Sequence, residues 1–221
     1  MKKKKQKAFV CSGGLLVAFV LWTLAICYAD VRAIGPRQTC VGLASLNGAF
    51  HRLTGVHMWL YTLTDWLSVI PLAFAAGFAL LGLAQWVRRK HLAQVDRDLL
   101  LLGAFYAAVI LFYLLFEAVP IHFRPVLIEG QLETSYPSST AVLVSCVMQT
   151  AILPLRVRIR RQWLERCMTA AIHGFTVFMV AGRLLSGVHW LGDIIGGLLL
   201  SASLVMAYTA LYPARKTIET E

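Results

Sequence analysis

The chain alternates between long apolar runs and short polar stretches, and six of these runs are long enough to cross a lipid bilayer. A transmembrane helix needs about 20 predominantly apolar residues. The six predicted spans cover residues 8–28, 66–87, 99–116, 138–155, 168–185 and 194–212. We therefore predict an all-α polytopic membrane protein with six transmembrane helices, folded as a single integral-membrane domain over residues 1–221.

The first long polar stretch contains a further helical pattern. Its residues recur at spacings of three and four, which places them on one face of a helix. They are Leu43, Leu46, Phe50, Leu53 and His57. Because Asn47 and His51 lie off that face, we expect a short amphipathic helix whose apolar face rests on the outer membrane surface. Trp59, Tyr61 and Trp66 follow it, as residues of an interfacial aromatic belt do.

Composition narrows the class of protein. Of the 221 residues, 58% are hydrophobic and 14% are charged, whereas a soluble domain averages about 25% charged residues. A soluble domain of this length buries only about 70% of its surface, so it cannot hide this many apolar side chains. These values exclude an ordinary soluble enzyme, a disordered chain and a small disulfide-stapled domain.

The positive residues behind the net charge of +10 are clustered between the apolar spans, and their positions indicate the orientation in the membrane. Sixteen of the 21 lysines and arginines fall in the N-terminal segment, the loops after the second and fourth spans, and the C-terminal tail. Cytoplasmic loops carry such an excess, so we predict that both termini lie in the cytoplasm. The lysine-rich start and the compact loops fit a bacterial inner membrane. No separate basic domain is present, so nucleic acid is not an expected partner. The first apolar run is longer than the core of a cleaved signal peptide, and we interpret it as a retained anchor.

The five cysteines do not form a disulfide framework. We expect small apolar packing residues, with a Cys27–Cys40 pair on the outer side as the alternative. The chain also lacks the C-x-x-C and H-E-x-x-H patterns that hold metals. No metal or other cofactor is therefore predicted.

Polar residues break the apolar pattern at three places, all on the predicted outer side. The most informative place holds His189 and Asp193, which are four residues apart and share one face of a helix. A carboxylate at this spacing can fix the tautomer of the imidazole and raise its basicity, as a nucleophilic histidine requires. The simpler alternatives are a structural histidine and an aspartate that only caps the last span.

The other polar residues suit an anion. Arg183 lies at the outer end of an apolar segment, and Arg124 lies in another outer loop; the planar guanidinium fork binds phosphate or carboxylate. Pro137 and the serines after it indicate a capped helix start, where free N–H groups favour an anion. We predict that these groups converge on one phosphate at the outer surface, with interfacial anchoring of Arg183 as the alternative.

These residues resemble the motifs of the type 2 phosphatidic acid phosphatase family, which shares its catalytic core with the vanadium haloperoxidases. The family pattern is K-x6-R-P, then P-S-G-H, then S-R-x5-H-x3-D. The matching residues are Arg124-Pro125, then Pro137-Ser138-Ser139, then Arg183, His189 and Asp193. They fall within residues 117–193, and the six-span layout is similar to the membrane-embedded branch of the family.

The resemblance implies a lipid phosphatase or pyrophosphatase that acts at the outer membrane face without a metal. The substrate would be a lipid phosphate ester or a polyprenyl pyrophosphate, such as undecaprenyl pyrophosphate. His189 would attack phosphorus to form a phosphohistidine, and Asp193 would orient it. The residues that would bind the phosphoryl oxygens are Arg124, Arg183, Ser138 and Ser139.

The sequence departs from the family pattern at Glu117 in place of lysine, at Gly182 in place of serine, and at Thr140 in place of the histidine that protonates the leaving oxygen. Loss of a general acid costs about 10²- to 10⁴-fold in rate. Three explanations stay open: a non-catalytic lipid-phosphate binder acting as a sensor, transporter or assembly partner; replacement of the acid by His122; or a leaving group acidic enough to need no help. Each predicts a different behaviour of the same phosphate site.

Overall fold

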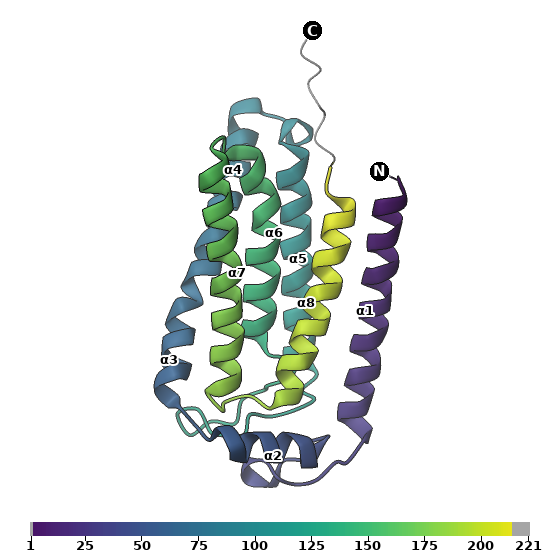
Figure 1. The fold of residues 1–221 in the computed structure, drawn as a ribbon, viewed down its shortest axis with the longest axis vertical. Coiled ribbons are helices and arrows are strands. Elements are labelled where there is room, and N and C mark those ends of the chain that lie inside the picture. Colours follow the sequence, from purple (N-terminus) through teal and green to yellow (C-terminus); the bar gives the residue numbers. More distant parts are fainter. Residues whose placement is uncertain (1, 214–221) are drawn as a thin grey trace.

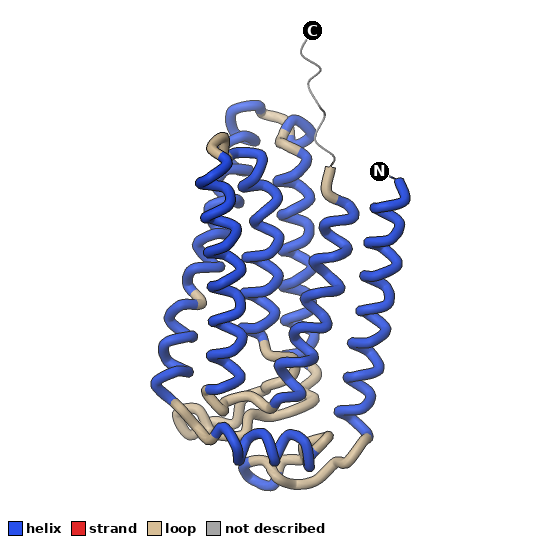
Figure 2. The backbone as a smooth tube through the Cα atoms, in the orientation of Figure 1, coloured by secondary structure: helices blue, strands red, loops and turns tan. Residues whose placement is uncertain are grey.

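The computed structural model describes residues 2–213, and within them the chain forms eight α-helices joined by mostly short loops (Figures 1 and 2). The helices are α1 (Lys2–Tyr28), α2 (Ala44–Thr54), α3 (Met58–Leu67), α4 (Val69–Arg89), α5 (Arg97–Ala118), α6 (Ser139–Arg158), α7 (Gln162–Leu185) and α8 (Leu191–Leu211). Two 3₁₀ turns, η1 (Pro36–Gln38) and η2 (Leu92–Gln94), lie in the loops. The predicted all-α architecture is confirmed.

Six helical segments are long and apolar enough to cross a membrane, as predicted. The second one differs from the prediction, because it runs from Met58 to Arg89 rather than over residues 66–87. It consists of α3 and α4, separated only at Ser68 (Figure 2). The residues predicted as an aromatic belt outside the span are therefore part of a helix that packs against α7.

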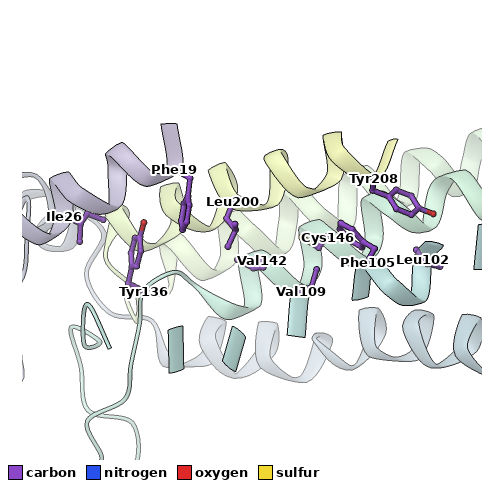
Figure 3. Packing of buried hydrophobic residues seen from close by; sticks show 10 residues of the cluster. All are labelled: Phe19, Ile26, Leu102, Phe105, Val109, Tyr136, Val142, Cys146, Leu200 and Tyr208. Atoms are coloured by element: carbon purple, nitrogen blue, oxygen red, sulfur yellow. The ribbon is translucent and has the colours of Figure 1, made fainter. Parts of the chain in front are cut away.

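Helix α6 lies at the centre of the bundle and packs against α4, α5, α7 and α8. One core cluster brings its Val142 and Cys146 together with residues of α1, α5 and α8 (Figure 3). A second cluster joins the other side of α6 to α7, through residues such as Met148 and Met179. The apolar residues of α6 thus face protein, whereas those of α1, α4 and α5 are largely exposed and available to lipid.

Helices α1 and α8 pack along each other (Figure 1). Ser12 and Ser203 link α1 to α8, because each hydroxyl donates a hydrogen bond to the carbonyl oxygen of the other residue at 2.9 Å. Small polar residues of this kind let membrane helices approach closely. The first residues of α1 and the last of α8 lie at the same end of the bundle, and α2 lies across the other end (Figure 1).

Helix α2 is the short surface helix that the sequence predicted, but the face that it packs on the protein is partly polar. Asn47 is fully buried: its amide donates to the carbonyl of Gly42 at 2.7 Å and its Oδ1 accepts from the Gly192 N–H at 2.9 Å. The apolar Leu46 and Leu53 are exposed, so this side is free to contact the membrane. All five cysteines are free thiols, so the alternative Cys27–Cys40 disulfide does not form.

Candidate active site

The loop between α7 and α8 carries His189 and is fixed tightly against the link between α2 and α3. Gly187 adopts a left-handed conformation with φ +69°, and a Cβ at this position would lie 2.0 Å from the carbonyl oxygen of Gly55. Only glycine permits both the conformation and the close approach. The His57 N–H also donates to the Ser186 carbonyl at 2.9 Å. His189 is consequently buried and held in place by backbone packing.

Asp193 lies in the first turn of α8 and contacts two partners. Its Oδ2 accepts from the Trp190 N–H at 2.9 Å, which caps the helix, and its Oδ1 lies 3.1 Å from Nδ1 of His122. The distance from Asp193 Oδ2 to His189 Nδ1 is 3.9 Å, which is longer than a hydrogen bond. The capping role considered for Asp193 is therefore present, and the carboxylate faces His189 without bonding to it.

His122 contacts the protein through both of its ring nitrogens. Its side chain is buried, and its Nε2 accepts a hydrogen bond from the Gly42 N–H at 2.9 Å. Because Nε2 accepts, Nδ1 must carry the proton that is donated to Asp193. Both ring nitrogens are thus used within the protein. The hypothesis that His122 replaces the absent acid does not fit this geometry.

The two predicted arginines converge on one aromatic ring. The guanidinium carbon of Arg183 lies 4.8 Å from the centre of the Tyr61 ring, and that of Arg124 lies 5.6 Å from it. Arg183 donates to Asp65 at 2.7 Å, and Arg124 lies 3.0 Å from Glu133. Both guanidinium groups are therefore oriented by α3 and by the loop before α6.

Several buried polar atoms of the predicted site residues have no hydrogen-bond partner in the protein. They are Nε and Nη1 of Arg183, Nη1 of Arg124, both ring nitrogens of His189, and the hydroxyl of Ser138. Unpaired buried polar groups are rare and cost about 1–3 kcal/mol each. Donors of this kind around a histidine suit an anion with several oxygens, such as a phosphoryl group.

The start of α6 contributes less than the sequence suggested. The backbone N–H of Ser138 donates to the Asp193 carbonyl at 3.1 Å, so it is not free to bind phosphate as the resemblance implied. The hydroxyl of Ser138 is buried without a partner. The N–H groups of Ser139 and Thr140 belong to the first helical turn, which has no intrahelical acceptors. The free backbone N–H groups of α6 therefore begin at Ser139.

A cavity of about 440 Å³ adjoins this cluster. Most of its lining is apolar and comes from α4, α5, α6 and α8, with residues such as Leu72, Tyr113, Phe116 and Leu143. Asp65, Ser139 and Thr140 line it as well. Asp65, which contacts Arg183, thus lines this cavity, whereas Arg124, Arg183 and His189 do not.

The departures from the family pattern have structural counterparts. Glu117 accepts a hydrogen bond from Thr134 at 2.9 Å and lines the cavity. Gly182 lies where α7 meets α3, and a Cβ there would be 2.7 Å from Cγ2 of Thr64. A serine at position 182 would therefore need a different neighbour on α3.

The surroundings of His189 favour its neutral form. Burial lowers the pKa of His189 below the ordinary histidine value, and the positive charges of Arg124 and Arg183 act in the same direction, while Asp193 opposes them. Nδ1 faces Asp193, so Nε2 is the nitrogen left to act on a ligand. Within residues 2–213, no three His, Cys, Asp or Glu side chains gather as a metal site requires.

Tyr61 and Asp65 were not among the residues that sequence reasoning assigned to the site. They are one helical turn apart on α3, so both reach Arg183. The sequence feature that pointed to this site was Asp65, an acidic residue directly beside an apolar run. Asp65 could be assigned to the site only if α3 continued the second span, and the hydrophobic pattern did not indicate that.

Neither a protein-family model nor a curated protein matches the chain. Among solved structures, it is similar to the crystal structure of a transmembrane PAP2 type phosphatidylglycerolphosphate phosphatase from Bacillus subtilis. The TM-score is 0.61 at 16% sequence identity, and the match covers 90% of this chain and 93% of the other. The chain has the fold of a PAP2 membrane phosphatase. The resemblance stated from the sequence motifs is confirmed at the level of the fold.

Proposed function

We propose that the protein is a lipid phosphatase or pyrophosphatase that forms a phosphohistidine at His189. The observation that carries this proposal is the set of unpaired, buried N–H donors of Arg124 and Arg183 beside a buried histidine. A phosphoryl group would satisfy these donors, and they would stabilise the charge that develops on its oxygens in the transition state. The fold shared with a PAP2 membrane phosphatase supports the same reaction class.

The adjoining cavity supports a lipid as the substrate. Its apolar lining and its volume of about 440 Å³ suit part of an acyl or isoprenoid chain. The phosphoryl group would lie at the arginines, and the leaving oxygen would face the cavity. Nε2 of His189 would form a bond to phosphorus as the bond to the leaving oxygen breaks, and water would then hydrolyse the phosphohistidine.

The test is phosphate release in detergent from phosphatidic acid, phosphatidylglycerol phosphate and undecaprenyl pyrophosphate. We expect wild-type protein to release phosphate from at least one of them and His189→Ala to lose that activity. His91→Ala is the matched control, because His91 is exposed in the loop between α4 and α5, away from the site. Equal release by wild type and His189→Ala, or none by either, would contradict the proposal.

The second candidate, a non-catalytic binder of lipid phosphate, is favoured by one observation. Thr140 occupies the cavity position where the resemblance expects an acidic histidine, and a hydroxyl is a poor acid at neutral pH. This candidate predicts saturable binding of phosphatidic acid that is lost in Arg124→Ala and Arg183→Ala, with no turnover of any substrate. Turnover that depends on His189 would eliminate it.

A further inference from the structure

Asp65 lies at the junction between the phosphate site and the cavity. Its carboxylate accepts from Nη2 of Arg183 at 2.7 Å, and the same residue lines the cavity together with Thr140. The Asp65 side chain is 60% exposed, whereas that of Arg183 is 2% exposed. Asp65 therefore contacts the proposed phosphate-binding arginine while much of its own side chain stays accessible to water.

We propose that Asp65 is the general acid of this site, in place of the histidine that is absent at position 140. This inference rests on the proposed function. A phosphoryl group bound to Arg183 would lie beside the Asp65 carboxyl group, because both would contact the same guanidinium. Aspartate and glutamate side chains serve as general acids in many enzymes.

The proposed steps balance in atoms and charge. Nε2 of His189 forms a bond to phosphorus while the bond between phosphorus and the leaving oxygen breaks, and protonated Asp65 transfers its proton to that oxygen. In the second step, a water oxygen bonds to phosphorus, the phosphorus–nitrogen bond breaks, and the Asp65 carboxylate takes the proton of that water. Free phosphate, neutral His189 and protonated Asp65 result.

Other acidic side chains near the cavity fit this role less well. Glu117 also lines the cavity, but it is held by the hydroxyl of Thr134 at 2.9 Å and does not contact either arginine. Glu133 is paired with Arg124 at 3.0 Å and is not among the residues that line the cavity. Among the acidic side chains of residues 2–213, Asp65 alone combines a contact to one of the proposed phosphate-binding arginines with a place in the cavity lining.

The experiment compares two leaving groups. A short-chain phosphatidic acid has an alkoxide leaving group that needs a proton, whereas p-nitrophenyl phosphate has a stable leaving group that does not. We expect Asp65→Asn to reduce kcat/KM for phosphatidic acid by about 10²- to 10⁴-fold and to change turnover of p-nitrophenyl phosphate by less than about tenfold. Glu129→Gln, which removes one charge from an exposed loop position, is the matched control.

Two further variants make the outcome decisive. Asp65→Glu keeps a carboxyl group and should retain part of the phosphatidic acid activity, and Thr140→His should restore activity in the Asp65→Asn background. An equal loss with both substrates would overturn the inference and assign Asp65 to positioning of Arg183; no loss with either would overturn it too. If p-nitrophenyl phosphate turnover does not depend on His189, the proposed function fails, and this inference fails with it.

Discussion

Removal of His122 should destabilise the protein more than removal of any exposed histidine. The imidazole accepts from the Gly42 N–H at 2.9 Å and lies 3.1 Å from the Asp193 carboxylate, in a site with 1% exposure. In His122→Ala both partners lose a buried hydrogen bond, at about 1–3 kcal/mol each, and the missing ring leaves a cavity with its own cost. We expect a total loss of about 3–6 kcal/mol in the free energy of unfolding.

The assay is a double-mutant cycle of His122→Ala and Asp193→Ala, with unfolding in detergent followed by tryptophan fluorescence. Residues that share a hydrogen bond show coupling energies of about 0.5–3 kcal/mol, whereas independent sites add within about 0.5 kcal/mol. His91→Ala should leave the unfolding free energy unchanged, because His91 is exposed. Additive effects of His122 and Asp193 would refute the reasoning from the buried contact.

The kinetics of the same variant separate structure from chemistry. If His122 only holds Asp193 and the Gly42 segment, His122→Ala should lower turnover of phosphatidic acid and of p-nitrophenyl phosphate by similar factors. If His122 were the general acid, the loss would be confined to the alkyl ester. A selective loss would therefore restore the hypothesis that the hydrogen bonds of His122 argue against.

Three further predictions follow from the site. Arg183→Lys, which keeps the charge and removes the planar fork, should lower kcat/KM by about 10²- to 10³-fold, measured as phosphate release. Gly182→Ser should cost about 1–3 kcal/mol of stability, because its Cβ would lie 2.7 Å from Cγ2 of Thr64, and Thr64→Ser in the same chain should recover most of this loss in thermal unfolding. In the dependence of kcat/KM on pH, the acid limb should have its midpoint below about 6.5, the ordinary pKa of histidine. The reason is that burial and the two arginines lower the pKa of His189, while Asp193 opposes them. A midpoint above about 6.5 would contradict the assignment of His189 as the nucleophile.

The membrane spans were predictable because each depends on a local property, a run of about 20 apolar residues. The error at the second span has the same origin. Helix α3 carries polar residues such as Thr64 and Asp65 among its aromatic ones, and the hydropathy pattern assigned it to a loop. It continues the span because its polar face packs on α7, where Gly182 leaves room for Thr64, and this contact is made between segments far apart in the sequence.

The candidate site was predictable only as far as motif spacing extends. The positions of Arg124, Arg183 and His189 were expected from the resemblance, and the structure places both arginines against the Tyr61 ring and near enough to His189 for their charges to act on it. The partners of these residues lay beyond sequence reasoning. Asp65 reaches Arg183 across 118 positions and His122 reaches Asp193 across 71, so neither contact follows from local spacing.

The departures from the family pattern are not scattered over the site. Glu117 and Thr140 both line the cavity, on the side where a leaving group would lie, whereas Arg124, Arg183 and His189 retain unpaired polar atoms suited to a phosphoryl group. The third departure, Gly182, is explained by the close approach of Thr64. Buried arginine donors that lack a partner cost stability unless an anion binds them, and both arginines keep such donors beside their ion pairs. This arrangement fits the proposed phosphate site, with the changes confined to the side where the leaving group would lie.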